Sequence, residues 1–149
     1  MTEREPLARV VQERLKELQL AHQALAASYR RIVDAEMIDA LALSEDGLIE
    51  IEAFTARYAR LVDVYLQQVL RAVDEWELLA PGSLLDRIDR AAKRGWVAQS
   101  SELIAARALR NRIAHEYDAE GWRQIARAAY ALVPALLLAV ERTLQARIV

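Results

Sequence analysis

The chain has 149 residues, a length that fits one domain with a sizeable buried core. Its formal net charge of −2 argues against a surface dedicated to coating DNA. The absence of cysteine excludes disulfides and thiolate zinc sites. We expect residues 1–149 to form a single helical domain, because helix-favouring Ala, Leu, Arg and Glu dominate and Gly and Pro are few.

The sequence contains no segment that we expect to enter a membrane. Its first ten residues, MTEREPLARV, are charged and lack the apolar core of a signal peptide. The most apolar stretch, residues 128–140, is too short to span a bilayer and contains Pro134. We therefore expect a cytoplasmic protein without a membrane partner.

Apolar residues in the first half recur at helical spacing. From Leu7 to Ile32 they recur at steps of three and four, which predicts one helix from near Pro6 to about Leu43. The pattern leaves room for a bend within this segment, although no Gly or Pro marks one. After a break at residues 44–47, a 3-4 repeat predicts a second long helix, suited to packing along an antiparallel neighbour.

Turn and capping residues divide the second half. Residues 79–83, LAPGS, predict a tight turn, after which Ser83 would cap a short helix over residues 84–94 that ends at Gly95. A further helix begins near Ser100 or Ser101 and runs into the sequence RNRIAHEY. Asp118 would cap the last helix, residues 119–147, and Pro134 should kink it. With no strand signal, the pattern predicts an all-α, up-and-down bundle of about five helices.

The candidate chemistry lies in RNRIAHEY, residues 110–117. Asn111 and His115 are four residues apart and share a helix face. Arg110 and His115 are about 140° apart on a regular helix, so they reach one cleft only if the helix ends near His115. The other histidine, His22, has no charged partner at turn spacing, which is typical of a core or boundary residue.

Two interpretations of the motif follow from spacing. A guanidinium binds phosphate through two hydrogen bonds and an imidazole titrates near neutrality, so Arg110 and His115 suit phosphodiester chemistry. Alternatively, Arg110 pairs with Glu116 or Glu120, and His115 is a cation at a helix C-terminus.

The motif resembles a known family signature. RNRIAHEY is similar to the RNxxxHxY signature of the HEPN superfamily, most closely that of HepT-like toxins and the related nucleotidyltransferase substrate-binding proteins. GSLLDRIDRAAKRGWV resembles the family's short helix with its Gly-hydrophobic pair, and IEAFTARYARLVDVYL its preceding long helix. The resemblance covers residues 49–138, and the first 45 residues match only as a generic helix.

The resemblance implies a helical-bundle homodimer in which two motif copies line one cleft and cut RNA without a metal or other cofactor. His115 would act as general base or acid, Arg110 would stabilise charge on the phosphate, and Asn111 would position the motif or the RNA. Tyr117 would accept AMP from a minimal nucleotidyltransferase, the antitoxin, and so silence a ribonuclease toxin. Alternatively, the Tyr117 hydroxyl only ties the turn to a neighbouring helix.

A second function remains open: a non-catalytic helical binding partner of a minimal nucleotidyltransferase. Residues 87–127 are locally basic, and Arg107, Arg112 and Arg123 would widen a phosphate-binding rim for RNA. Nearby acidic residues, namely Glu116, Asp118 and Glu120, would oppose RNA. Trp96 and Trp122 would either stack on bases or, more typically, belong to the core.

Overall fold

The computed structural model describes residues 3–116 and 118–149, and all the regular elements within these ranges are helical. This confirms the predicted all-α class. The elements in chain order are α1 (Arg4–Arg31), α2 (Ala35–Leu41), α3 (Glu45–Asp63), the π-helix η1 (Val64–Val69), α4 (Leu70–Trp76), α5 (Leu84–Lys93), α6 (Ser100–Ile113) and α7 (Ala119–Gln145). Because α3, η1 and α4 run on without a break, these described ranges contain six helices rather than about five.

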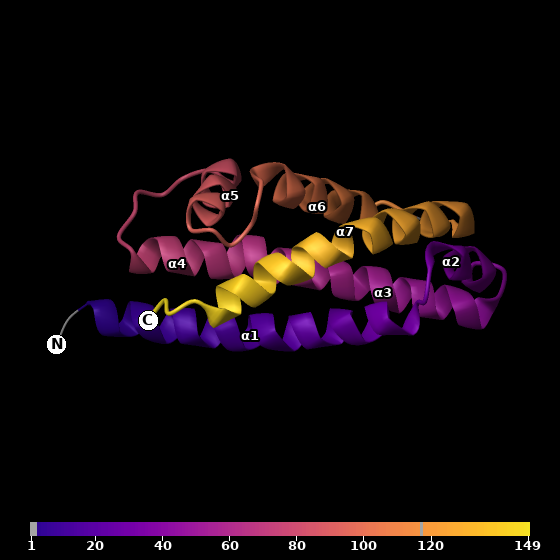
Figure 1. Ribbon diagram of the computed structural model, residues 1–149, viewed down its shortest axis with the longest axis horizontal. Coiled ribbons are helices and arrows are strands. Elements are labelled where there is room, and N and C mark those ends of the chain that lie inside the picture. The colour runs from indigo at the N-terminus through magenta and orange to yellow at the C-terminus, as the bar shows by residue number, and fades with distance from the viewer. Residues whose placement is uncertain (1–2, 117) are drawn as a thin grey trace.

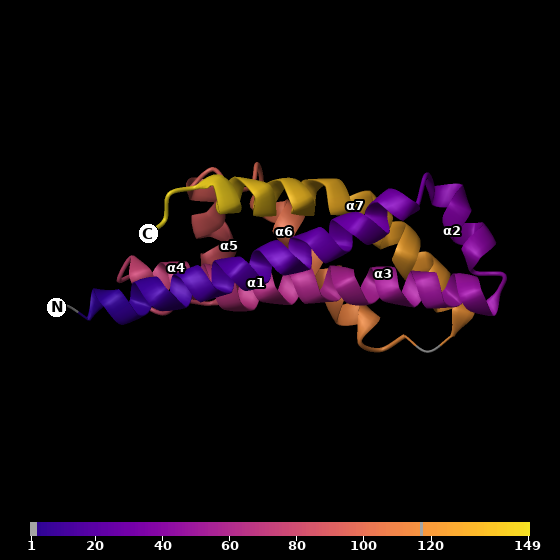
Figure 2. The same ribbon diagram turned by 90° about the horizontal axis from the view of Figure 1, so that it is seen from below.

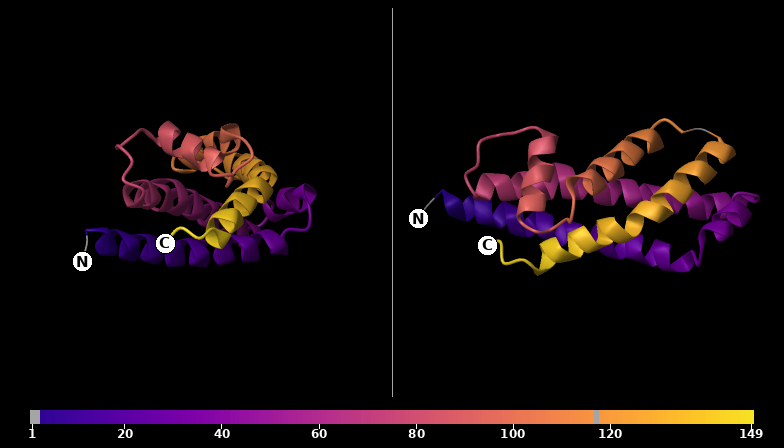
Figure 3. Two further views of the ribbon diagram at one scale, coloured as in Figure 1. Left: turned by 60° about the vertical axis from the view of Figure 1, so that its left-hand side comes forward. Right: turned by 45° about the horizontal axis from the view of Figure 1, so that its top comes forward.

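Four long helices run up and down the molecule. α1 lies antiparallel to the helix formed by α3, η1 and α4 (Figure 1). α6 lies on the other side of that helix, and α7 returns antiparallel to α6, crossing the bundle diagonally towards α1 (Figure 1). α2 closes one end of the bundle, where α3 begins, and α5 lies across the other end (Figure 3). The buried side chains of these helices form one hydrophobic core.

The middle of the second long helix is wound more loosely than an α-helix. Residues 64–69 form a π-helical segment, which accommodates one extra residue without interrupting the helix. Four of its residues remain buried: Val64, Tyr65, Leu66 and Val69. The Tyr65 hydroxyl lies 2.7 Å from Oγ1 of Thr143 on α7, so this segment is also tied to the last helix.

The prediction of one helix reaching Leu43 is wrong. The chain leaves the helical conformation after Arg31, and Asp34 adopts an extended backbone with φ −160° and ψ 173°. Its carboxylate accepts a hydrogen bond from the Met37 N–H at 2.9 Å and so starts α2. A capping aspartate, rather than a Gly or Pro, therefore marks the break.

The predicted caps of the second half are confirmed. Ser83 and Asp86 form a reciprocal capping box at the start of α5, and Gly95 follows its end with a left-handed φ of 81°. Asp118 accepts a hydrogen bond from the Gly121 N–H at 2.7 Å and caps α7. α7 continues through Pro134, and its axis bends between its orange and yellow parts (Figure 2).

α7 is the one helix of the described ranges that is long and apolar enough to cross a membrane by length and composition. Its most apolar 18-residue window is 39% buried within the bundle. The buried positions include Ile125, Val133 and Val140, which belong to the core that α7 forms with α1, α3 and α6. Core packing therefore accounts for part of its apolar character.

Candidate active site

The sequence RNRIAHEY begins in the last turn of α6. The buried side chains of α6, Leu103, Ala106 and Leu109, hold this helix against α3 and α7. The helix ends at Ile113, and the His115 N–H donates to the Arg112 carbonyl at 3.1 Å in the turn that follows. The helix thus ends before His115, as the predicted site requires.

Arg110 is held by an acidic residue of another helix. Its Nε donates to Oδ1 of Asp63 at 2.7 Å, and its Nη2 donates to Oδ2 at 2.8 Å. The hydrogen bonds from Asp63 raise the pKa of Arg110 above its usual range, which keeps the guanidinium cationic. Arg110 is thus paired with a residue of α3, not with Glu116 or Glu120, the two partners considered from the sequence.

The Arg110–Asp63 pair faces an open groove of about 890 Å³ between α1, α3, η1 and α6. The two side chains retain 29% and 40% exposure, so the ion pair is accessible from the groove. Other residues that line the groove combine small, apolar and charged side chains, among them Arg14, Leu20, Ala59, Arg60, Val64 and Ile113.

His115 faces a different hollow. It is exposed and lines a shallow depression of about 400 Å³ together with Asn111, Arg112 and Glu116. Asn111 and His115 therefore share a surface, as their spacing predicts. Within one copy of the chain, the described residues do not bring Arg110 into this hollow, so the two predicted catalytic side chains line separate surfaces.

Tyr117 lies outside the described residues. On either side of it, Glu116 and Asp118 are both described. The Glu116 carboxylate lies against Gly121, whose missing side chain leaves room for it. Together with the Asp118 cap, this contact fixes the start of α7 close to the end of α6.

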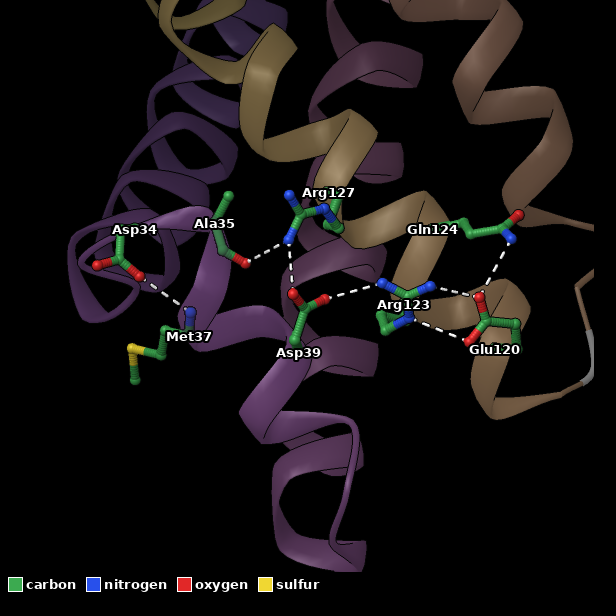
Figure 4. A network of polar contacts seen from close by, with 8 residues as sticks. All are labelled: Asp34, Ala35, Met37, Asp39, Glu120, Arg123, Gln124 and Arg127. Carbon is green, nitrogen blue, oxygen red and sulfur yellow. Dashed lines mark hydrogen bonds and ion pairs between the residues drawn. The ribbon is translucent and has the colours of Figure 1, made fainter.

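Arg123, a predicted RNA contact, belongs to an ion-pair network that joins α2 to α7 (Figure 4). Its Nη1 donates to Asp39 at 2.9 Å, and its Nε and Nη2 donate to the Glu120 carboxylate. Arg127 also donates to Asp39, at 2.8 Å. The hydrogen bond from Arg123 lowers the pKa of Asp39 below its usual range.

The other two predicted RNA contacts, Arg107 and Arg112, are exposed on α6. Within residues 3–116 and 118–149, neither takes part in an ion pair. The three arginines of the predicted rim therefore differ: Arg123 holds two helices together, and the other two are open to solvent.

The remaining candidate residues from the sequence, Trp96, Trp122 and His22, lie in the core or at its boundary. Trp96 is 7% exposed and lies beneath the Arg94 guanidinium, 5.1 Å from ring centre to Cζ, while the partly buried Trp122 packs against the core. Nε2 of His22 lies 3.2 Å from the Glu141 carboxylate of α7, so His22 is a boundary residue. Across the part of the chain that the structure describes, no group of three or more acidic or histidine side chains is arranged to hold a metal ion.

Asp63 is the site residue that sequence reasoning missed. Its only sequence signal is a carboxylate between two apolar neighbours, Val62 and Val64, both of which are buried. Such a residue often accompanies a cation from another helix, but spacing alone does not say which one.

Comparison with protein-family models, with curated protein sequences and with solved structures finds no match to this chain.

Proposed function

We propose that this chain is a metal-independent endoribonuclease of the HEPN class and acts in the cytoplasm as the toxin paired with a minimal nucleotidyltransferase antitoxin. One observation carries the proposal. At the end of α6, an ion-paired but accessible Arg110 is followed, just past the helix terminus, by an exposed His115. A fixed cation and a solvent-accessible imidazole are the two groups that RNA cleavage needs without a metal.

The proposed reaction uses the RNA's own 2′-hydroxyl. One His115 removes the proton of this hydroxyl, and the oxygen attacks the adjacent phosphorus. The bond from phosphorus to the 5′-oxygen breaks, a second His115 donates a proton to that oxygen, and a 2′,3′-cyclic phosphate and a 5′-hydroxyl result. Arg110 stabilises the negative charge that develops on the phosphate oxygens, and Asn111 orients His115 or the substrate.

A homodimer is part of the proposal. In one copy, Arg110 and His115 line separate surfaces, and both surfaces are open. A second copy placed against the end of α6 would bring an arginine and a histidine from different copies to one phosphate. This separation supports a site completed by two chains.

The test is cleavage of RNA by the purified full chain in the presence of EDTA. We expect cleavage to persist with the chelator and to yield cyclic phosphate ends. Arg110→Ala and His115→Ala should each lower the rate by a factor of about 10² or more while far-UV circular dichroism is unchanged. Arg31→Ala, which removes an arginine paired with Glu50 away from the groove, is the matched control and should cut normally. Cleavage at the wild-type rate by both site variants, or none by the wild type, would disprove the assignment.

The proposed control point is Tyr117. AMP transferred to its hydroxyl would add bulk and negative charge beside the site and exclude RNA. We expect a minimal nucleotidyltransferase encoded beside this chain to add one AMP in the presence of ATP, detected by mass spectrometry, and to stop cleavage. Tyr117→Phe should prevent both effects, whereas Tyr130→Phe should not.

A non-catalytic partner of such a nucleotidyltransferase is the second candidate. Acidic residues near His115 favour it, because Glu116, Asp118 and Glu120 repel phosphate, and Asp63 neutralises part of the Arg110 charge. Expression of the chain alone separates the two functions. Growth arrest that is relieved by the neighbouring nucleotidyltransferase supports the ribonuclease, and harmless expression supports the binding partner.

A further inference from the structure

We infer that Asp63 is a positioning residue that holds the Arg110 guanidinium in the orientation that binds a phosphate of the RNA. The inference rests on the proposed function and adds a residue of α3 to a site otherwise carried by the end of α6. Asp63 does not itself contact RNA in this arrangement, since its role is exerted through Arg110.

The geometry of the pair leaves a phosphate-binding edge free. A guanidinium has five N–H groups, and a carboxylate that bonds Nε and Nη2 uses one edge of the plane. Asp63 occupies that edge with bonds of 2.7 and 2.8 Å. The adjacent edge, formed by Nη1 and the second N–H of Nη2, has the parallel donors that two phosphate oxygens accept. Nη1 of Arg110 donates to no residue of the described ranges.

The backbone of Asp63 is flanked on both sides by residues of the core. Val62 and Val64 are 1% and 7% exposed, so the backbone of Asp63 belongs to a well-packed part of the long helix. Its side chain nevertheless reaches the groove, where Arg110 meets it. Without Asp63, the flexible arginine side chain would sample several rotamers before each encounter with RNA. The ion pair removes that freedom in advance.

In the same molecule, Arg123 is an arginine whose guanidinium is hydrogen-bonded along two edges. Glu120 occupies its Nε–Nη2 edge, and Asp39 bonds Nη1 from another helix (Figure 4). Both edges of Arg123 are therefore in use, whereas within residues 3–116 and 118–149 only the Nε–Nη2 edge of Arg110 is hydrogen-bonded. The negative charge of Asp63 opposes a phosphate, but water screens this partly exposed pair. In this proposal, orientation of the free edge favours phosphate binding by more than the charge of Asp63 opposes it.

The experiment compares Asp63→Ala, Asp63→Asn, Arg110→Ala and the Asp63→Ala/Arg110→Ala double variant in the full chain. Glu50→Gln is the matched control, because Glu50 is also a partly exposed acid paired with an arginine, Arg31, at 2.7 Å. For each protein, kcat and KM are measured on an RNA oligonucleotide. Affinity is measured with the 2′-deoxy oligonucleotide of the same sequence, which binds but has no hydroxyl to react.

We expect Asp63→Ala to weaken binding of the deoxy oligonucleotide and to lower kcat/KM by about tenfold each. Asp63→Asn keeps one acceptor for Arg110 and should lose less affinity and less of kcat/KM. In the Arg110→Ala background, removal of Asp63 should cause no further loss, because its effect passes through Arg110. Glu50→Gln should behave as the wild type. Asp63→Asn also serves if Asp63→Ala does not fold, which circular dichroism would reveal.

Four outcomes would overturn the inference. Tighter binding or faster cleavage by the Asp63 variants would mean that Asp63 restrains Arg110 instead of presenting it. A further loss in the Arg110→Ala background would mean that Asp63 acts independently of Arg110. Unchanged affinity and kcat/KM would mean that it does nothing at the site.

If the wild type binds the deoxy oligonucleotide but cleaves no RNA, the ribonuclease assignment fails alone, and the binding series still decides the role of Asp63. A wild type that neither binds nor cleaves would overturn both.

Discussion

The hydroxyl of Tyr58, on α3, donates a hydrogen bond to the main-chain carbonyl of Ala106, on α6, at 3.0 Å. Both residues are buried in the core. In an α-helix this carbonyl also accepts the backbone N–H four residues later, which is that of Arg110. Tyr58 therefore fixes α6 to α3 one turn before the candidate catalytic arginine.

Replacing Tyr58 with Phe should lower the free energy of unfolding by about 1 kcal/mol, because one buried hydrogen bond is lost while the carbonyl keeps its helical partner. Urea unfolding followed by far-UV circular dichroism measures the change. Tyr130→Phe is the control, since its hydroxyl makes a longer bond, 3.3 Å, to an exposed carbonyl. Equal losses of unfolding free energy in the two variants would show that the buried bond to Ala106 stabilises the fold no more than the exposed one.

Alkaline pH should destabilise the fold through two buried tyrosines. Burial raises the pKa of Tyr65 to about 12 and also raises that of Tyr58 above its usual range. Because the folded-state pKa exceeds the unfolded one, this stability is complete below about pH 10 and declines as the pH rises towards the folded pKa. Each tyrosine should lower the free energy of unfolding by up to about 1.4 kcal/mol per pH unit in this range. Urea unfolding at several pH values between about 10 and the folded-state pKa measures this decline. The free energy of unfolding of Tyr65→Phe should fall less steeply with pH than that of the wild type, and an equally steep fall would contradict the prediction.

Two helical glycines should respond oppositely to alanine. At Gly47, near the start of α3, a methyl group would overlap the main-chain carbonyl of Leu41 at the end of α2. Gly47→Ala should therefore lower the free energy of unfolding by about 2 kcal/mol, although alanine favours helix. At Gly121 the three atoms nearest to the methyl group would belong to the Glu116 carboxylate, which can rotate away. Gly121→Ala should be neutral or stabilising. Similar melting temperatures for the two variants would refute this contrast.

Arg112 and Arg123, two arginines near the motif, should differ in their effects on RNA binding. Arg112→Ala removes an exposed cation next to Asn111 and should weaken binding of a deoxy oligonucleotide and lessen its dependence on salt. Arg123→Ala should chiefly lower stability, because Arg123 joins Asp39 of α2 to Glu120 of α7. Fluorescence anisotropy at several salt concentrations and thermal unfolding distinguish the two. A larger binding loss in Arg123→Ala than in Arg112→Ala would contradict the assignment.

Local signals in the sequence predicted local structure well. Ser83, Gly95 and Asp118 act on backbone groups within a few residues, so their roles as caps and stops could be inferred directly. At Asp34, three residues after α1 ends and within an apolar repeat, the same kind of signal starts α2. Capping by Asp34 outweighs the helical periodicity that continues across it.

The long-range part of the site could not be predicted in this way. RNRIAHEY indicates Arg110 and His115, and the end of α6 before His115 agrees with the expected setting. The pairing of Arg110 with Asp63 joins residues on different helices and depends on how the helices pack, which spacing along the chain does not specify. The same holds for the separate surfaces that Arg110 and His115 line, because helix packing rather than local spacing decides which neighbours each one meets.

The π-helical turn at residues 64–69 lies between the two aspartates of the long helix that pair with arginines of other helices. Asp63 and Asp74 are separated by a spacing that returns an ideal α-helix to within about 20° of the same direction. On a regular helix the two carboxylates would therefore point in nearly the same direction, about 16 Å apart along the helix axis. The π turn accommodates one added residue without its full share of rotation, and in the structure Asp63 meets Arg110 of α6 while Asp74 meets Arg90 and Arg94 of α5. Deletion of one residue in this turn would restore a regular α-helix with the two aspartates ten residues and about 80° apart, so both carboxylates should keep their present partners.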